Sequence, residues 1–266
     1  MDFLQIIALA VVQGVTEFLP VGSEAHLMLA GKLFSIDQTD AGIAIPLHIG
    51  AVLAVIAYFH SEMGSAVMGL FQTLRGRPSA HTRLAGKLLM GSLPWLVIAG
   101  ALVALGYTPS PGTLLLLAWM MLGIGLLMLV TDRIGMTVRR VEHMGAGTAL
   151  LFGLVQAVAL IPGAGRLAMT MTVARLLGFE RRDAARYAML IGILPMLALT
   201  GWHSWGQLHT GEWTVGVVGA VGGGAAFIAA YAAIAFLMSW LRRGTLLPFA
   251  LYRVILGGAL LYSLYT

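Results

Sequence analysis

The chain alternates between long apolar runs and short polar segments, and six of the runs are long enough to cross a bilayer. A transmembrane helix needs about 20 predominantly apolar residues. Runs of this kind occupy residues 41–60, 87–107, 113–130, 186–202, 215–241 and 248–265. The pattern therefore predicts an all-α polytopic membrane protein with six transmembrane helices.

The overall composition supports this prediction. Of the 266 residues, 59% are hydrophobic and 10% are charged, whereas soluble proteins average roughly 45–50% apolar and 25% charged residues. So few polar residues cannot coat a soluble globule, and a single integral membrane domain over residues 1–266 is the simplest arrangement. The net charge of +5 does not indicate nucleic acid binding, because the basic residues lie in short loops beside apolar runs.

The basic residues also predict how the helices are oriented. Loops that stay in the cytoplasm are enriched in Lys and Arg. Arginines gather in four connections, at residues 61–86, 131–147, 180–186 and 242–247. Lys and Arg are absent from residues 35–40, 108–112 and 203–214. We therefore expect the first group of connections in the cytoplasm and the second group outside.

Two further apolar segments are expected to enter the membrane and turn back. Residues 148–179 join two connections that are both predicted to be cytoplasmic, so this segment must return to the side from which it entered. Its turn is marked by Pro162 and Gly163, because such residues break a helix and are tolerated at depth only against protein or a wet cavity. Residues 1–34 form a corresponding hairpin from outside, with a turn at Pro20. Both chain termini are then outside.

The two hairpins resemble each other and suggest an internal repeat. Gln13 precedes the first turn much as Gln156 precedes the second, and each hairpin is followed by three predicted spans. Repeat 1 covers about residues 1–130 and repeat 2 about residues 148–266. A hairpin and three spans that recur in opposite orientation form an inverted-topology repeat, whose interrupted helices usually build the functional site near the bilayer midplane.

Charged and titratable residues lie in or beside both turns. They are Glu17, Glu24, His26 and Arg166. A charge at the centre of a membrane helix costs about 2.5–3.5 kcal/mol on insertion scales, so each one needs a partner or a function. One interpretation is structural: Glu17 and Arg166 pair to pin one hairpin to the other, and His26 is a satisfied interior histidine. The other interpretation is a catalytic site.

These residue types together match the needs of phosphoryl transfer. The planar guanidinium of Arg166 fits phosphate oxygens, and His26 titrates near neutral pH and can carry a proton. Ser23 is a candidate nucleophile. Glu17 and Gln13 are one helical turn apart and form a plausible ligand pair for Mg²⁺ or Ca²⁺. The glycine-rich backbone at residues 163–165 can bring amide N–H groups close to an anion.

Three motifs resemble one known family, in order and along the whole chain. Residues 13–27, QGVTEFLPVGSEAHL, are similar to the (E/Q)GxTEFLPxSSxxHL signature of the undecaprenyl-diphosphate phosphatase family, also called the bacitracin resistance protein BacA family. Residues 160–166, LIPGAGR, together with Thr170 resemble its PGxSRSGxT motif, and residues 247–253, LPFALYR, resemble its PFxxYR segment. The first of these motifs is highly specific.

The resemblance implies a fold and an activity. It implies six spans, two re-entrant hairpins, an outward-facing site in the bacterial inner membrane and dependence on a divalent cation. The implied reaction removes the terminal phosphate of a polyprenyl diphosphate, which recycles the lipid carrier of cell-wall synthesis. The partners are then this lipid substrate and the surrounding membrane lipids, and the sequence leaves a homodimer open.

The resemblance also assigns roles to individual residues. The essential acid of the family falls on Glu17, its histidine on His26, its arginine on Arg166 and its motif serine on Ser23. Its metal-side position falls on Gln13.

Four further positions are expected to contact substrate. They are Gly163, Gly165, Thr170 and His48. His48 matches a common family position and is a candidate for the lipid entrance, although such a histidine more often caps or packs a helix.

The chain departs from the family pattern beside the predicted site. Gly22, Gly165 and Leu167 stand where the family usually has Ser, and Glu24 stands where a small or hydroxyl residue is common. The lost hydroxyls favour an alternative function, a catalytically altered member that binds or flips polyprenyl phosphate without hydrolysis. Metal-dependent release of phosphate distinguishes the enzyme from this carrier.

Overall fold

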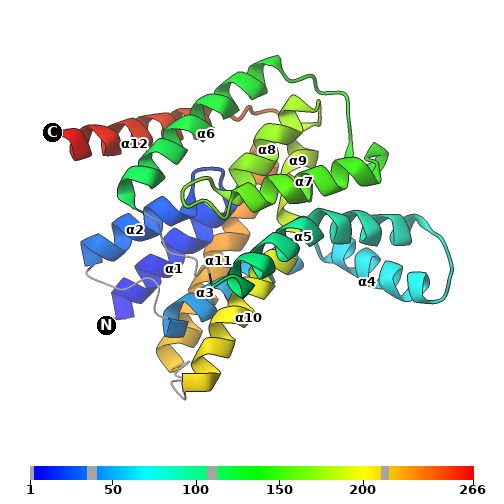
Figure 1. The fold of residues 1–266 in the computed structure, drawn as a ribbon, viewed down its shortest axis with the longest axis horizontal. Coiled ribbons are helices and arrows are strands. Elements are labelled where there is room, and N and C mark those ends of the chain that lie inside the picture. Colours follow the sequence, from blue (N-terminus) through cyan, green and yellow to red (C-terminus); the bar gives the residue numbers. More distant parts are fainter. Residues whose placement is uncertain (1–2, 35–40, 107–112, 211–215) are drawn as a thin grey trace.

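The computed structural model describes residues 3–34, 41–106, 113–210 and 216–266, and this part of the chain is helical without a β-strand (Figure 1). The helices are α1 (Phe3–Phe18), α2 (Ser23–Phe34), α3 (Ala41–Tyr58), α4 (His60–Leu74), α5 (Ala80–Ala104), α6 (Leu114–Ile134), the 3₁₀ turn η1 (Val141–His143), α7 (Ala146–Val158), α8 (Arg166–Leu176), α9 (Arg181–Ile191), α10 (Ile193–Thr210), α11 (Val217–Trp240) and α12 (Leu247–Tyr265). The predicted all-α class is confirmed for these residues.

Five helical segments within the described ranges are long and apolar enough to cross a membrane. They are α5, α6, the continuous segment Arg181–Trp202 of α9 and α10, α11 and α12. The pair of α3 and α4 gives a sixth candidate, but the two helices are bent by 88° relative to each other. Each predicted apolar run therefore corresponds to a helix or helix pair, and the polytopic membrane architecture is confirmed at this level.

The connection predicted at residues 61–86 is more ordered than a loop. Helix α4 occupies most of it and packs against the first turns of α5, and the two project together at the right of Figure 1. Ser79 begins α5 as a capping residue, because its hydroxyl accepts a hydrogen bond from the Thr82 amide at 3.2 Å. Gly69 permits the close contact, since a Cβ there would lie 2.2 Å from the His81 carbonyl oxygen.

Each of the two segments predicted to form a hairpin contains two successive helices that pack against each other. Helices α1 and α2 are joined by residues 19–22, and α7 and α8 by residues 159–165. Gly22, Gly163 and Gly165 adopt φ values of +89°, +87° and +74°. This left-handed conformation is accessible to glycine at little cost, so glycine suits all three positions.

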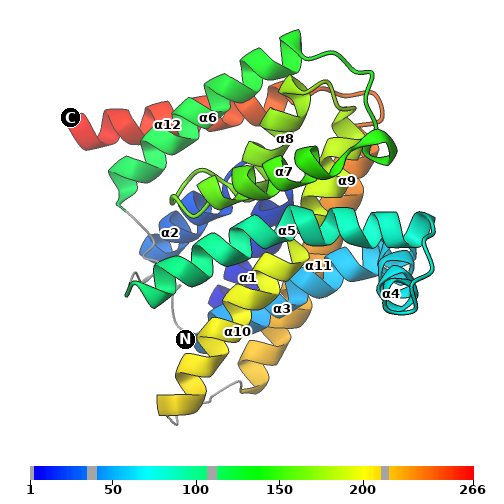
Figure 2. The same ribbon diagram turned by 45° about the vertical axis from the view of Figure 1, so that its right-hand side comes forward.

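Each hairpin packs on a helix from the other half of the chain, as Figure 2 shows. Helix α1 lies against α11, where Gly14 allows backbone contact with Ala226. Helix α7 lies against α5, where Gly153 contacts Pro94. The crossed packing brings the two turns toward each other in the middle of the molecule.

A buried cluster of ion pairs around Asp132, near the end of α6, connects several helices. The Asp132 carboxylate accepts hydrogen bonds from the Arg175 Nε at 3.0 Å, the Arg181 Nε at 2.6 Å and the Leu246 amide at 2.9 Å. These contacts join α6, α8, α9 and the start of α12. Since Arg175 lies in the last turn of α8 and Arg166 is its first residue, the cluster fixes the helix that presents Arg166.

Candidate active site

The two charges that the sequence places on separate hairpins are in direct contact. Arg166 Nη2 donates a hydrogen bond to Glu17 Oε1 at 2.5 Å, and its Nη1 donates to the Gly192 carbonyl at 3.0 Å. Their side chains are 18% and 14% exposed, so the pair is largely shielded from its surroundings. Arg166 thereby joins the start of α8 to the end of α1 and to the break between α9 and α10.

Ser23 belongs to the same cluster. Its Oγ donates a hydrogen bond to Glu17 Oε2 at 2.9 Å. Both carboxylate oxygens of Glu17 are therefore engaged, one by the guanidinium and one by the serine hydroxyl. Ser23 occupies the first position of α2, one helical turn before His26.

The hydrogen bonds of His26 determine its tautomer. Nδ1 lies 2.7 Å from the Gly22 carbonyl oxygen, which can only accept, so Nδ1 carries the proton. In the neutral ring Nε2 is then an acceptor, and the Tyr252 hydroxyl donates to it at 2.6 Å. The two rings are also stacked, with centroids 5.5 Å apart and an interplanar angle of 12°. Tyr252 on α12 thus orients the histidine.

Glu24 of α2 and Arg253 of α12 both bind the second turn. The Glu24 carboxylate accepts a short hydrogen bond from the Gly163 amide. Arg253 Nη2 donates to the carbonyl oxygens of Gly163 at 2.9 Å and Ala164 at 3.1 Å. Glu24, at the position where the sequence departs from the family pattern, therefore faces the second turn and holds it.

Arg253 is a site residue that the sequence reasoning did not assign. Its side chain is 0% exposed, and its Nε and Nη1 have no hydrogen-bond partner within the described part of the chain. A Cβ at Gly22 would lie 3.0 Å from Nη1, and one at Gly165 would lie 3.1 Å from it. The guanidinium thus occupies space next to two glycines that replace family serines. The available signal was an arginine inside a predicted apolar span, which needs a partner or a function.

The space around Glu17 and Arg166 is small. The cavity measures about 20 Å³ and is lined by Thr16, Glu17, Leu19, Pro20, Gly22, Ser23, Gly165, Arg166, Leu167 and Ala168. A single water needs about 10–15 Å³ on this measure. The space therefore has no room for a diphosphate in this arrangement, because Glu17 and Arg166 pair directly with each other. A diphosphate would fit here only if the two side chains separated.

The donors suit a divalent cation that is shared with a substrate. The described residues contain no group of three or more His, Cys, Asp or Glu side chains placed to hold a metal ion. Mg²⁺, however, is usually bound by one or two carboxylates together with substrate phosphates. Glu17 is near enough to Glu24 for their charges to interact, and the buried Gln13 precedes Glu17 by one turn of α1. These oxygen donors fit such an ion in kind.

The four residues expected to contact substrate differ in how close they lie to the Glu17–Arg166 pair. Gly163 and Gly165 lie in the second turn, and Gly165 lines the cavity. The Gly163 amide is already bonded to Glu24. The Thr170 hydroxyl donates to the Arg166 carbonyl at 2.9 Å and so supports the start of α8. His48 bonds through Nδ1 to the Ala44 carbonyl of its own helix at 2.7 Å, and no hydrogen bond or ion pair between described residues links it to the cluster.

Comparisons with known proteins agree along the whole length of the chain. A model of the family described as bacitracin resistance protein BacA matches residues 6–259. Undecaprenyl-diphosphatase 1 of Rhodospirillum rubrum is 39% identical over 100% of this chain and 96% of its own length. The undecaprenyl-diphosphatase of Maricaulis maris is 40% identical over 98% of both chains, and that of Roseobacter denitrificans is 36% identical over 100% of both.

Proposed function

The chain belongs to the bacitracin resistance protein BacA family, and from this premise we propose that it is an undecaprenyl-diphosphatase that hydrolyses the terminal phosphate of a polyprenyl diphosphate. The observation that carries the proposal is the contact between Glu17 and Arg166, which unites two hairpins that are distant in the sequence. The names of the full-length relatives favour the enzyme over a carrier without hydrolytic activity.

Arginines provide the main electrostatic contribution to this reaction. Phosphoryl transfer depends on positioning and on stabilising charge on the phosphoryl oxygens. Arg166 exchanges Glu17 for phosphate oxygens when substrate enters, and its fork of donors matches their geometry. The unpartnered Nη1 of Arg253 lies beside Gly22 and Gly165, where it adds positive charge to the same space. A divalent cation held by Glu17 with Gln13 would neutralise further charge on the diphosphate.

The geometry favours Ser23 as the nucleophile. Its hydroxyl already donates to Glu17, so this carboxylate is in place to accept the proton as Oγ attacks the terminal phosphorus. The bond from that phosphorus to the bridging oxygen breaks, and the polyprenyl monophosphate leaves. Water then hydrolyses the phosphoserine and releases phosphate. His26 supplies Nε2 as the proton-accepting nitrogen, in the tautomer fixed by Gly22.

Tyr252 is expected to act through His26 as a positioning residue. The change Tyr252→Phe removes the hydroxyl that donates to Nε2 but keeps the stacked ring, so kcat should fall about tenfold while KM stays unchanged, a modest part of the roughly 10²–10⁴-fold that acid–base catalysis contributes. Steady-state phosphate release from farnesyl diphosphate measures both parameters. Tyr262→Phe, an exposed residue on the same helix, is the matched control. Equal kinetics in the two variants would remove this role.

We also propose that the protein is a single domain in the bacterial inner membrane, with re-entrant hairpins, an outward-facing site and both termini outside. Contacts between the four basic connections support one common side for them. Arg186 binds Glu142 at 2.9 Å and Glu62 at 3.7 Å, which joins three of them. The Leu246 amide bonds to Asp132 and joins the fourth. The crossed packing of α1 on α11 and of α7 on α5 supports the inverted repeat.

A direct assay tests the proposed function. The full chain, purified in detergent, is incubated with undecaprenyl or farnesyl diphosphate, with and without a chelator, and released phosphate is measured. We expect release that the chelator abolishes and that added Mg²⁺ or Ca²⁺ restores. Binding of the lipid without release of phosphate under any of these conditions would contradict the enzyme and favour the carrier.

A further inference from the structure

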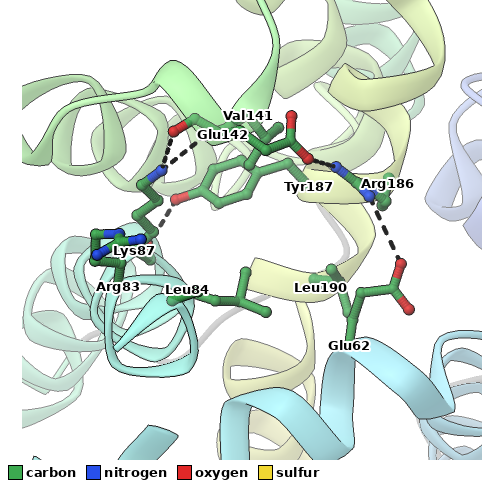
Figure 3. A pocket seen from close by; sticks show the side chains of 10 residues that line it. Glu62, Arg83, Leu84, Lys87, Val141, Glu142, Arg186, Tyr187 and Leu190 are labelled. Carbon is green, nitrogen blue, oxygen red and sulfur yellow. Dashed lines mark hydrogen bonds and ion pairs between the residues drawn. The ribbon is translucent and has the colours of Figure 1, made fainter. Parts of the chain in front are cut away.

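A second cavity, with several charged side chains in its lining, lies away from the Glu17–Arg166 pair at the corner where α4, α5, η1 and α9 meet (Figure 3). Its volume is about 230 Å³, against about 20 Å³ at the candidate active site. The lining residues are Glu62, Ala80, Arg83, Leu84, Lys87, Val141, Glu142, Arg186, Tyr187 and Leu190. They come from three of the four basic connections or their borders. In the proposed topology, this cavity opens at the cytoplasmic surface of the membrane.

The two acidic side chains that line this cavity, Glu62 and Glu142, are both bound by one arginine, which also contacts Asp183 beside the cavity. Arg186 binds Glu142 at 2.9 Å, Asp183 at 3.3 Å and Glu62 at 3.7 Å. Figure 3 shows Arg186 between the first and last of these contacts, on the wall opposite Lys87. Within the described ranges, none of these carboxylates makes a salt bridge with Arg83 or Lys87, so the positive charges on the other wall are not directly ion-paired.

The opposite wall therefore offers donors for an anion. Lys87 Nζ donates to the carbonyls of Val141 at 2.9 Å and Glu142 at 2.8 Å, which leaves one of its three N–H groups. Arg83 makes no side-chain hydrogen bond or ion pair with any residue that the structure describes. The two cations are one turn apart on α5, where like charges repel, and the charge of Arg83 acts on Lys87 together with the opposite charge of Glu142. An anion between them removes this repulsion.

The surroundings favour an amphiphile over a soluble ion. Leu84 and Leu190 line the cavity beside the charges. Helix α4 is bent 88° from α3, so if α3 crosses the bilayer α4 lies along its surface. Met68 and Phe71 of α4 are 52% and 58% exposed, as in helices that insert an apolar face at the level of the lipid head groups.

We propose that this cavity binds the phosphate of an anionic phospholipid head group, with Arg83 and Lys87 as its ligands. Basic pockets between transmembrane helices on the cytoplasmic side are suited to such head groups. The acyl chains would lie against exposed apolar side chains of α4. The site is separate from the catalytic cluster and does not depend on the proposed hydrolysis.

The test compares lipid binding by the purified full-length protein and two arginine variants. Native mass spectrometry from a neutral detergent gives the apparent affinity for dioleoyl phosphatidylglycerol. Arg83→Gln should weaken binding about fivefold, the effect expected of one basic residue near an anionic lipid. Arg77→Gln is the matched control, because Arg77 is exposed in the same connection but does not line the cavity. This control should bind like the wild type.

Two additional probes identify the source of the phosphate. Dioleoyl phosphatidylcholine should bind more weakly than phosphatidylglycerol, and millimolar inorganic phosphate should fail to displace the anionic lipid. Displacement by inorganic phosphate would overturn the lipid assignment in favour of a free phosphate. Unchanged binding in Arg83→Gln, or an equal loss in both arginine variants, would overturn the site itself.

Discussion

Phosphate release from a polyprenyl diphosphate is expected to fall on the order of 10³-fold when Arg166 is replaced by alanine, which lies within the range for an arginine that stabilises a phosphoryl-transfer transition state. The guanidinium is the cationic group that bridges Glu17 of one hairpin and the Gly192 carbonyl between α9 and α10. Without this guanidinium, the phosphate oxygens lose a forked hydrogen-bond donor and the Glu17 carboxylate loses its ion-pair partner. Initial rates of phosphate release measure the effect.

Two further variants separate catalysis from folding in this experiment. The variant Arg166→Lys retains the charge but loses the planar fork, so its activity should lie between the activities of Arg166→Ala and the wild type. Arg243→Ala changes an exposed arginine in a connection outside the site and should keep full activity. Thermal unfolding of each protein provides the folding check. If the variant Arg166→Ala kept an activity within about threefold of the wild type, the proposed role of Arg166 in catalysis would be ruled out.

The change Arg253→Met should lower activity about 100-fold, because a misplacement of about 1 Å in a catalytic group can cost this much. Arg253 holds the carbonyls of Gly163 and Ala164, three and two residues before Arg166. Methionine fills similar volume without a buried charge, but it leaves both carbonyls without this donor. Kinetics with farnesyl diphosphate should show a loss in kcat/KM, accompanied by a lower unfolding temperature.

The matched control for this change lies on the same helix. Leu256→Met alters a partly buried residue of α12 in the cluster that packs on α6, and it should leave kcat/KM within about twofold of the wild type, since such volume-conserving exchanges are well tolerated. Arg253→Lys should also be impaired, because one ammonium group lacks the fork that spans the turn. Wild-type kinetics in Arg253→Met would mean that the buried arginine serves only the fold.

Much of this arrangement was predictable from the sequence for physical reasons. The length of apolar runs predicts spans because the bilayer sets the length of a helix. Pro20 and Pro162 predict the two turns, and the cost of an isolated charge at depth predicts that Glu17 and Arg166 need partners. Glu17 and Arg166 lie beside different turns, and neither has an oppositely charged residue beside its own turn. The proposed repeat brings the two turns together, so a contact between these two residues was expected.

Other features depend on helix rotation and crossing angles, which the sequence does not specify. Arg253 is a lone arginine in an apolar run, and its contact with the second turn exists only because α12 presents this face to Gly163. The bond from the Gly163 amide to Glu24 likewise depends on how closely the two turns approach. The bend between α3 and α4 could not be predicted in this way, because residue 59 is neither proline nor glycine. The cavity at the candidate active site is small because Glu17 and Arg166 pair directly. The sequence predicts the charges of these two residues but not the size of the space between them.

Glu17 and Arg166 are proposed to act as one catalytic unit, and a double-mutant cycle tests this most directly. Phosphate release from undecaprenyl diphosphate is measured for the wild type, Glu17→Gln, Arg166→Ala and the protein with both changes. Residues that act as a unit are strongly non-additive, so the double variant should be about as slow as the slower single variant. Losses that multiply in the double variant would show that the two residues act independently and would contradict the shared site.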